Sequence, residues 1–252
     1  MKKSLLLPLA ALLILSGCAN PGGTSSMTAP ASAASSATLN AAQQLYAAAL
    51  ANHKALEYID ATVTTDIITG GETTHADQKI QVVHPNGPDT LVYMSVEKSG
   101  VGGGQTYSGQ MEYGYYKDGW VYIEEFFPAQ SGGGNSTKVK VKKTAESYLT
   151  AIWLPEAADL QNAALDGVAI TADCPAFARH NLSFDDPGTV TSEPATVVVQ
   201  NGQIVSIHQK MSGPAYPGSA DITQNEITVT FQNIGQPVTV TLPTDLDSYT
   251  IE

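Results

Sequence analysis

The spacing of the apolar residues changes after Tyr58, and this change most constrains the fold. Before it, apolar side chains recur at steps of three and four residues, which is typical of an amphipathic helix. After it, apolar and polar residues alternate in short runs rich in Val, Ile, Thr and Tyr, separated by Gly, Pro and Asn. The pattern therefore predicts one helix followed by a sheet of many strands. The helix is expected over the apolar stripe of Leu39, Ala42, Leu45, Tyr46, Ala49, Leu50, His53 and Leu56.

Two dipeptides mark tight hairpins in the strand region. Asp118-Gly119 and Asn201-Gly202 are pairs that accept the positive φ of two-residue turns. Two other segments, 147–154 and 156–165, are compatible with helices, and Pro155 suits a first helical turn. The alternating segments are expected to be strands: residues 62–68, 78–83, 91–97, 112–117, 120–126, 178–184, 195–200, 203–211, 226–233 and 238–242.

These elements predict one α+β domain, an antiparallel sheet of about nine or ten strands covered on one face by a few helices. Ile227, Val229 and Phe231 alternate with polar neighbours, so one face of the sheet is expected to be apolar and the other solvated. A sheet of this size curls into a half-barrel. Its apolar concave face is either filled by side chains or left as an apolar cavity.

The N-terminus carries a targeting segment. Two lysines precede an apolar run over residues 5–15, which is shorter than the roughly 20 residues that a membrane-spanning helix needs. The run ends in Leu15-Ser16-Gly17-Cys18, which resembles the lipobox of bacterial lipoproteins. The resemblance implies that residues 1–17 are a signal peptide and that Cys18 is lipidated by acyl chains such as palmitate. The alternative is an ordinary secretory signal that happens to contain a cysteine.

A tether is expected between this anchor and the domain. Residues 18–38 are mostly Asn, Pro, Gly, Ser, Thr and Ala, which bury too little apolar surface to order themselves. Flexible-chain scaling gives the tether an r.m.s. span of roughly 25 Å. The domain itself is expected over residues 39–252, held at the extracytoplasmic face of a cell membrane. Ala19 follows the cysteine and leaves the choice of membrane in a two-membrane envelope open.

The charge of the chain limits its partners. It has 12 Lys and Arg against 24 Asp and Glu, a formal net charge of −12. Nucleic acid and anionic lipid surfaces repel a protein of this charge, so neither a nucleic-acid partner nor a polybasic docking role is expected. The basic residues that do cluster are interpreted as a solvated strand edge, and they are Lys138, Lys140, Lys142 and Lys143.

The chain has only two cysteines. If Cys18 carries lipid, Cys174 has no cysteine to pair with, and the domain must fold without a disulfide. No basic residue adjoins Cys174 to lower the pKa of its thiol. Cys174 is therefore expected to be a small, buried, unreactive residue.

Three segments and a helical insert in the middle of the sheet resemble one family of lipoproteins. The segments are Tyr58-Ile59-Asp60-Ala61-Thr62-Val63 after the first helix, the aromatic hairpin over residues 115–122, and the ending over residues 231–243. Together they resemble the LolA-like fold, shared by the outer-membrane carrier LolA and by lipid-binding lipoproteins of the LppX/LprG type. The resemblance covers residues 39–252 and implies a curled, LolA-like half-barrel. It specifies no ligand, because one fold hosts many functions.

The sequence contains no catalytic or metal-binding motif, so neither enzyme activity nor a cofactor is predicted. The five histidines are scattered, and neither Cys-x-x-Cys nor His-Glu-x-x-His occurs. Asp173, Asp185 and Asp186 lack the glycine spacing of calcium loops and are interpreted as solvated. No Gly-x-Ser-x-Gly motif accompanies the many serines.

Aromatic side chains are densest over residues 113–127. Cross-strand packing explains most of them, since alternation divides the rings between the two faces of the sheet. The functional alternative is that some line the mouth of an apolar cavity together with the insert. Trp153 is favoured because it lies at the boundary of the insert without an evident strand partner. The candidate ligand-binding residues are Met94, Met111, Trp120, Tyr122, Trp153 and Leu154.

The resemblance and the alternation together predict a membrane-anchored lipoprotein that binds a hydrophobic ligand, either a lipid or an acyl chain, without covalent chemistry. The alternative is an interaction or sensing module of the cell envelope, with a filled core and a protein partner. A dry apolar cavity favours ligand binding. A filled interior with an exposed apolar patch of more than a few hundred Å² favours the interaction module.

Overall fold

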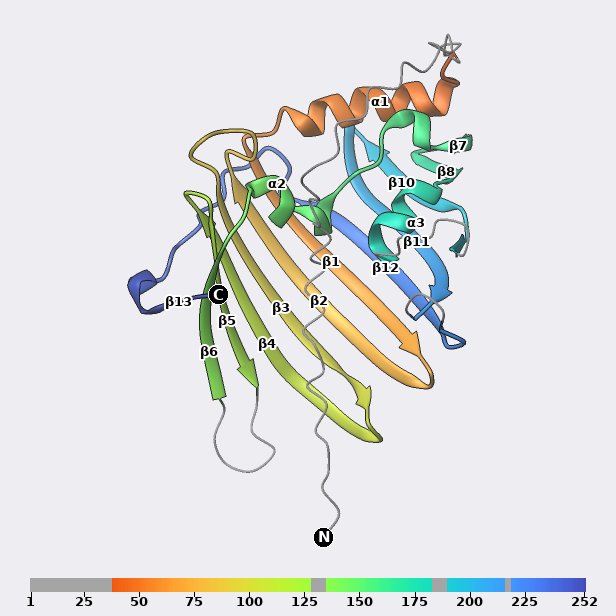
Figure 1. Ribbon diagram of the computed structural model, residues 1–252. Helices are drawn as coiled ribbons and strands as arrows, with labels where there is room; N and C mark the ends of the chain where they lie inside the picture. The colour runs from red at the N-terminus through yellow and green to blue at the C-terminus, as the bar shows by residue number, and fades with distance from the viewer. Residues whose placement is uncertain (1–37, 128–134, 183–189, 216–218) are drawn as a thin grey trace, which may run out of the picture.

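A computed structural model describes residues 38–127, 135–182, 190–215 and 219–252. Its strands form one 13-stranded sheet against which the helices pack (Figure 1). The strand order is β13-β6-β5-β4-β3-β2-β1-β12-β11-β10-β8-β7, with β9 beside β11. In chain order the elements are α1 (Ala41–Lys54), β1 (Tyr58–Thr69), β2 (Glu72–Val83), β3 (Leu91–Gly102), β4 (Gln105–Lys117), β5 (Trp120–Phe127), β6 (Asn135–Lys142), α2 (Ala145–Tyr148), η1 (Thr150–Ile152), η2 (Ala157–Asp159), β7 (Gln161–Asp166), β8 (Ala169–Asp173), α3 (Pro175–Leu182), β9 (Thr191–Ser192), β10 (Ala195–Gln200), β11 (Gln203–Pro214), β12 (Ile222–Gln232), η4 (Leu246–Ser248) and β13 (Thr250–Ile251).

The sheet is curled and does not close. Its strand pairs are antiparallel, with the exception of β13, which lies parallel to β6. The first strand, β1, lies inside the sheet between β2 and β12, so strands from both ends of the chain meet there. The edge strands, β7 and β13, lie at opposite ends of the strand order. The predicted fold class, a curled antiparallel half-barrel with few helices, is therefore confirmed.

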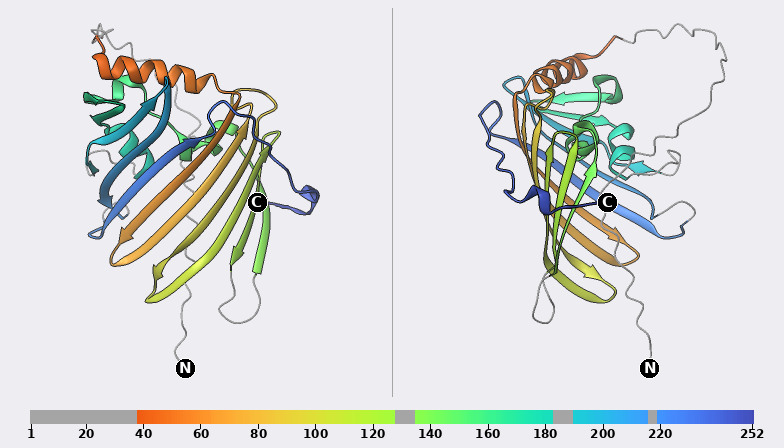
Figure 2. Two further views of the ribbon diagram at one scale, coloured as in Figure 1. Left: turned by 180° about the vertical axis from the view of Figure 1, so that it is seen from behind. Right: turned by 60° about the vertical axis from the view of Figure 1, so that its left-hand side comes forward.

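The two faces of the sheet have different surroundings. We call the face against α2, η1 and α3 the inner face and the opposite one the outer face (Figure 2). On β1, Ala61 and Val63 point inward and are 0% and 2% exposed, whereas Thr62 and Thr64 between and beyond them are partly exposed. The C-terminal segment lies on the outer side, where the ring of Tyr249 packs edge-on against the ring of Tyr122 with the centroids 5.5 Å apart.

Helix α1 crosses one end of the sheet (Figure 1). It begins with a capping box, because the side chain of Asn40 accepts from the N–H of Gln43 and the side chain of Gln43 accepts from the N–H of Asn40. Its inward face carries the fully buried Tyr46, whose hydroxyl donates to the carbonyl of Pro155 at 2.8 Å. The helix is therefore fixed both by apolar burial and by a hydrogen bond to a distant part of the chain.

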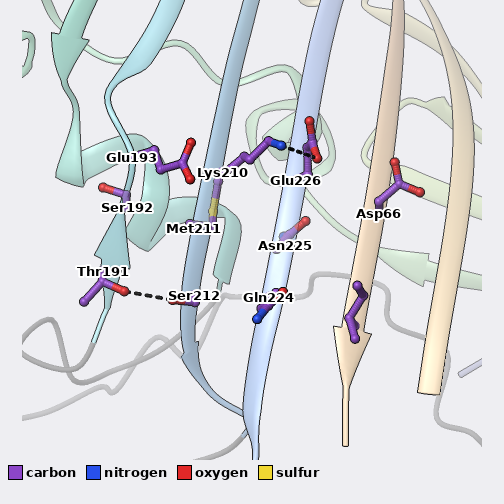
Figure 3. A pocket seen from close by; sticks show the side chains of 11 residues that line it. Asp66, Thr191, Ser192, Glu193, Lys210, Met211, Ser212, Gln224, Asn225 and Glu226 are labelled. Carbon is purple, nitrogen blue, oxygen red and sulfur yellow. Dashed lines mark hydrogen bonds and ion pairs between the residues drawn. The ribbon is translucent and has the colours of Figure 1, made fainter. Parts of the chain in front are cut away.

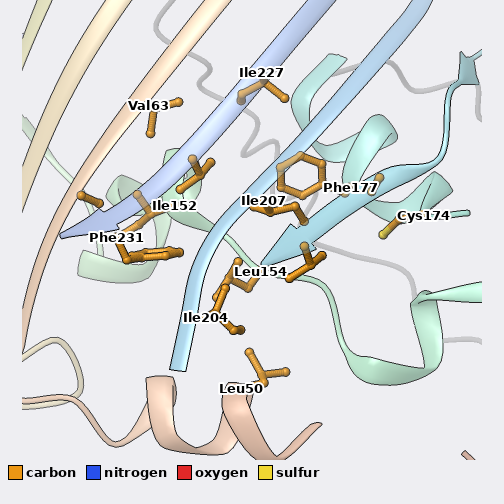
Figure 4. Close-up of a cluster of buried hydrophobic side chains, with 14 of the residues drawn as sticks. Leu50, Val63, Ile152, Leu154, Cys174, Phe177, Ile204, Ile207, Ile227 and Phe231 are labelled. Atoms are coloured by element: carbon orange, nitrogen blue, oxygen red, sulfur yellow. The ribbon is translucent and has the colours of Figure 1, made fainter. Parts of the chain in front are cut away.

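One continuous core lies between the inner face and the helices. Figure 4 shows side chains from the sheet, α1, α3 and the region of η1 meeting in it. Ile207 and Phe177 are 0% and 1% exposed and represent the sheet and α3 in this core. Burial of such side chains contributes roughly 1.5–3 kcal/mol each, so the core is the main source of stability.

The positive φ angles predicted for the two hairpin turns are confirmed. Asp118 and Asn201 have φ of 52° and 51°, and the glycine after each is also at positive φ. Each pair joins two antiparallel strands, β4 with β5 and β10 with β11. These turns explain why the adjoining strands begin where the sequence predicts.

Three predicted elements are wrong. Residues 178–184 were expected to form a strand, but Pro175–Leu182 is the helix α3. Residues 156–165 were expected to form a helix, but they contain the short turn η2 and then strand β7. Residues 238–242 alternate between partial and full exposure, yet they form no strand. The strands β7, β8, β9 and β13 were not predicted, and β6 was expected only as a basic strand edge.

The predicted signal peptide, Cys18 and nearly all of the tether lie outside the described residues, as do Asp185 and Asp186. In the parts of the chain that the structure describes, no helix combines the length and the apolar character needed to cross a bilayer.

Candidate functional site

The inner face carries an apolar floor across five strands. Ala61, Ile80, Met94, Gly114 and Ile123 lie side by side in register on β1 to β5, and every one of them is buried. The row toward α1 is also apolar, with the buried Val82, Val92 and Val121. A floor of this kind can hold aliphatic or aromatic groups and offers them no hydrogen bonds.

A short segment covers this floor. We call residues 144–160, which contain α2, η1 and η2, the insert. Its side chains Tyr148, Ile152 and Leu154 are 7%, 6% and 8% exposed and belong to the core; Ile152 and Leu154 are labelled in Figure 4. In this conformation the covered part of the inner face is filled by protein.

The fit between insert and floor depends on one glycine. The hydroxyl of Tyr148 lies where a side chain on Gly114 would begin, so any Cβ at residue 114 would collide with it. The ring of Tyr148 stacks on Tyr116 with the centroids 6.4 Å apart. The absence of a side chain at residue 114 therefore lets the insert approach the sheet closely.

Hydrogen bonds to α3 and α1 hold the insert at three positions. Near α3, Thr150 accepts a hydrogen bond through its carbonyl at 2.8 Å from Nε2 of His180. Near α1, Tyr46 donates to Pro155 and Gln43 donates to the carbonyl of Leu160 at 2.9 Å. The backbone hydrogen bonds of η1 and η2 join residues of the insert itself. Apolar contact is thus the main link between the middle of the insert and the sheet.

Beyond the apolar floor, the inner face becomes polar. In the direction away from α1, Lys98 on β3 lies 3.4 Å from the carboxylate of Glu112 on β4, and both side chains are largely buried. Glu125 lies directly opposite Glu112 on β5. Burial first, and then the charge of Glu112, raise the pKa of Glu125. An apolar surface bordered by charged groups suits a molecule with an apolar part and a polar end.

The structure distributes the six predicted ligand-binding residues over three places. Met94 lies on the inner face and Leu154 in the insert, and both belong to the core. Trp153, also in the insert, faces α3 and stacks on His180 with the centroids 4.6 Å apart. The other three lie on the outer face, because they alternate with the inward-facing residues of β4 and β5; they are Met111, Trp120 and Tyr122.

Sequence reasoning missed the residues that shape the inner face. Gly114 and Tyr148 are far apart in the sequence and have no motif, so their contact follows only from the register of β4 and the path of the insert. Lys98 on β3 and Glu112 on β4 stand at the same alternate positions as the buried, inward-facing residues of their strands. That alternation was available in the sequence, but charged residues at the end of an apolar stripe are ordinarily interpreted as solvated.

A separate open groove lies over β1, β12, β11 and β9, with a volume of about 500 Å³ (Figure 3). Its lining is mostly polar and includes Asp66, Glu193 and Glu226. Hydrogen bonds from His208 first, and then from Lys210, lower the pKa of Glu226. The carboxylates outnumber the one lysine of the lining, so this groove does not suit an anionic molecule.

The described part of the chain contains no group of three or more His, Cys, Asp or Glu side chains that could hold a metal ion. His75, for example, pairs with carboxylates and not with a metal-binding cluster. Its Nδ1 lies 2.7 Å from Oδ1 of Asp66, and hydrogen bonds to Asp66 and Asp77 raise the pKa of the His75 ring. Cys174 is fully buried and free, and burial raises the pKa of its thiol to about 11. Such a thiol is protonated at neutral pH and is a poor nucleophile.

The curled, open sheet with an inner helical cover is the half-barrel that the sequence predicts. No family model and no curated protein matches the sequence. Among solved structures, the chain is similar to the lipoprotein LppX of Mycobacterium tuberculosis, with 15% identity, a TM-score of 0.43, and coverage of 80% of this chain and 98% of that one. It is also similar to LprF of Mycobacterium bovis, with 16% identity, a TM-score of 0.40, and coverage of 80% and 96%. A DUF1329 family protein of Desulfovibrio piger has 10% identity and a TM-score of 0.21, with coverage of 76% and 93%. LppX is one of the lipoproteins to which the sequence resemblance pointed.

Proposed function

We propose that this chain is a membrane-anchored extracytoplasmic lipoprotein whose inner face binds a hydrophobic molecule, a lipid or an acyl chain, non-covalently. One observation carries the proposal. The apolar floor is covered by an insert with one four-residue helix and two three-residue 3₁₀ turns, and not by a second sheet or a long helix. Such a cover has little regular structure to lose when it moves.

Ligand binding on this floor requires the insert to move away from the sheet. An acyl chain would replace the contacts that Tyr148, Ile152 and Leu154 make with the sheet. Each Å² of apolar surface that the ligand covers contributes about 25 cal/mol, which offsets the loss of the insert's own contacts. The hydrogen bond at Pro155 lies at one end of the moving part and suits the role of a hinge, whereas the one at Thr150 lies within the moving part and must break.

Native mass spectrometry of residues 39–252, purified from lipid-containing cells, tests the proposal directly. We expect a bound hydrophobic molecule, or uptake of added palmitic acid. Hydrogen exchange should then rise in residues 145–154 and stay unchanged in β1 to β3, because the sheet does not move. A domain that carries no such molecule, and whose exchange palmitic acid leaves unaltered, would contradict the proposal.

A pair of matched variants separates loss of the cover from general destabilisation. Tyr148→Ala removes a side chain that occupies the inner face and should increase the uptake of palmitic acid. Tyr249→Ala removes an equally large side chain that is 3% exposed, against 7% for Tyr148, but it lies on the outer face. It should destabilise the fold without changing uptake. Equal uptake by the two variants would refute a site beneath the insert.

The filled interior favours a second candidate function, an interaction or sensing module of the cell envelope whose partner is a protein. In that case the insert is a permanent part of the core. The exchange experiment distinguishes the two functions, because a permanent cover stays protected in the presence of palmitic acid.

A further inference from the structure

The outer face of β4, β5 and β6 carries a cluster of basic and aromatic side chains. Lys117, Trp120 and Lys142 lie in one cross-strand row, and Tyr122 and Lys140 lie in the next. We call these five residues the lysine–tryptophan patch. The sequence shows only that lysines alternate along β6. The register of the sheet is what places them against the tryptophan of β5 and the last lysine of β4.

The lysines of the patch contact aromatic rings. The ammonium group of Lys142 lies 5.3 Å from the ring centroid of Trp120, and that of Lys140 lies 5.8 Å from Trp120 and 6.0 Å from Tyr122. These distances are typical of cation–π contacts. The rings remain partly exposed, so each presents one surface to solvent beside a positive charge.

Lys140 and Lys142 carry charge without an ion pair in a protein with twice as many acidic as basic residues. Like Lys79 and Lys143, neither has a carboxylate within ion-pair distance among the described residues, whereas Lys54 and Lys98 each have one and Lys138 has two. The charges of Lys140 and Lys142 are available to an external anion.

Acidic side chains define the limits of the patch. Asp118 lies 3.9 Å from Lys117 at one end. At the other end Lys138 is neutralised by Asp245 at 2.8 Å and Glu124 at 3.8 Å. The free positive charge is therefore concentrated around Trp120.

We propose that the lysine–tryptophan patch is a docking surface for anionic lipid headgroups, which orients the domain on the membrane. Lysine is attracted to an anionic lipid surface, and tryptophan and tyrosine prefer the boundary between headgroups and acyl chains. The net charge of −12 repels the rest of the protein from the same surface, so this face is the one that can approach it. The proposal rests on the membrane anchoring contained in the proposed function, and it adds the orientation in which the anchored domain meets the bilayer.

The test uses residues 18–252, with Cys18→Ser so that an acyl anchor plays no part. Its partition is measured on vesicles of phosphatidylcholine alone and of phosphatidylcholine with phosphatidylglycerol. We expect binding to the anionic vesicles only, weakening as salt is added. Lys140→Gln with Lys142→Gln should weaken it about thirty-fold. Lys54→Gln with Lys79→Gln, which removes the same charge elsewhere, should leave most of the binding intact. Equal loss in the two double variants would overturn the proposal.

Tryptophan emission separates docking on the outer face from uptake into the inner face, because the chain has two tryptophans. With Trp153→Phe, Trp120 is the reporter, and its emission should shift to shorter wavelength on anionic vesicles. With Trp120→Phe, Trp153 reports on the insert and should respond to palmitic acid and not to vesicle binding. No shift of Trp120, or stronger binding to polyglutamate than to anionic vesicles, would overturn lipid docking and leave the inner-face proposal standing. A silent Trp153 with a shift of Trp120 would count against inner-face uptake alone.

Discussion

At the scale of single residues, Gly114 decides how closely the insert approaches the sheet. A methyl group there collides with the hydroxyl of Tyr148, and the buried ring has little freedom to move. We expect Gly114→Ala to lower the free energy of unfolding by about 1–3 kcal/mol, the usual cost of overpacking. Gly102→Ala is the matched control on the same sheet, because its Cβ would meet no atom closer than 3.8 Å.

Denaturant unfolding measures both changes. Tyr148→Phe removes the colliding hydroxyl, so the double variant Gly114→Ala with Tyr148→Phe should recover part of the lost stability. An equal loss for Gly114→Ala and Gly102→Ala, or no recovery in the double variant, would show that the close approach is not what requires glycine.

His53 gives the fold a pH dependence. Its ring packs edge-on against the ring of Phe231 with the centroids 4.4 Å apart. Burial lowers the pKa of His53 from 6.5 to about 4. The unfolded chain therefore binds a proton at a higher pH than the folded chain. The stability due to the neutral ring is complete above pH 6.5 and is lost as the pH falls toward 4, by on the order of 3 kcal/mol.

The measurement is the free energy of unfolding of the wild type and of His53→Leu between pH 7 and pH 4. Leucine keeps an apolar group against Phe231 and binds no proton, so the variant should lose less stability over this range. Parallel curves for the two proteins would exclude His53 as the source of the slope.

Cys174 is a second buried residue whose chemistry follows from its surroundings. It is 0% exposed beside α3, and burial raises the pKa of its thiol to about 11. We expect one slowly reacting thiol in the folded domain, and a loss of about 1 kcal/mol for Cys174→Ala. Thiol titration with and without denaturant measures the reactivity. Fast and complete labelling of the native domain would mean that the thiol is exposed in solution.

At the scale of elements, the sequence predicted strands best where a turn fixed their ends. β5 and β11 begin at Trp120 and Gln203, as expected, because Asp118-Gly119 and Asn201-Gly202 accept the positive φ that their turns need. Residues 178–184 were wrongly predicted to be a strand because their apolar residues also fit a period of two. The true pattern includes Phe177, which with Ala178 and the buried residues one turn later forms a helical stripe.

Long-range pairing was the part of the site that the sequence could not supply. Met111, Trp120 and Tyr122 lie in predicted strands, but which face of the sheet they share depends on the register between β4 and β5. Alternation fixes the relative orientation of residues within a strand and leaves open which set faces the core. The inward set includes Gly114 and Ile123, and the rings of Trp120 and Tyr122 lie on the outer face.

At the scale of the whole molecule, the open sheet has consequences for both faces. A closed barrel would fix its interior, whereas this sheet has an inner face bounded by an insert and an outer face exposed beside the C-terminal segment (Figure 2). The two proposals divide these faces between them. The inner face has the apolar floor that suits an acyl chain, and the outer face has the charge and the aromatic rings that suit headgroups.

In the proposed function, attachment to a membrane depends on Cys18, which lies outside the described residues. A single lipid chain binds a bilayer only marginally, while two or three hold it firmly at about 0.8 kcal/mol per buried methylene. A few lysines cannot replace such an anchor.

We therefore expect Cys18→Ala to abolish lipid attachment and either to release the protein into the soluble fraction or to leave the signal peptide uncleaved. Fractionation of the native host, with mass spectrometry of the N-terminal peptide, measures both outcomes. Lys140→Gln with Lys142→Gln is the control: because Cys18 is retained, that variant should stay in the membrane fraction even if its orientation changes. A Cys18→Ala protein that remained membrane-bound with a normal mature mass would show that something other than this cysteine holds the chain to the membrane.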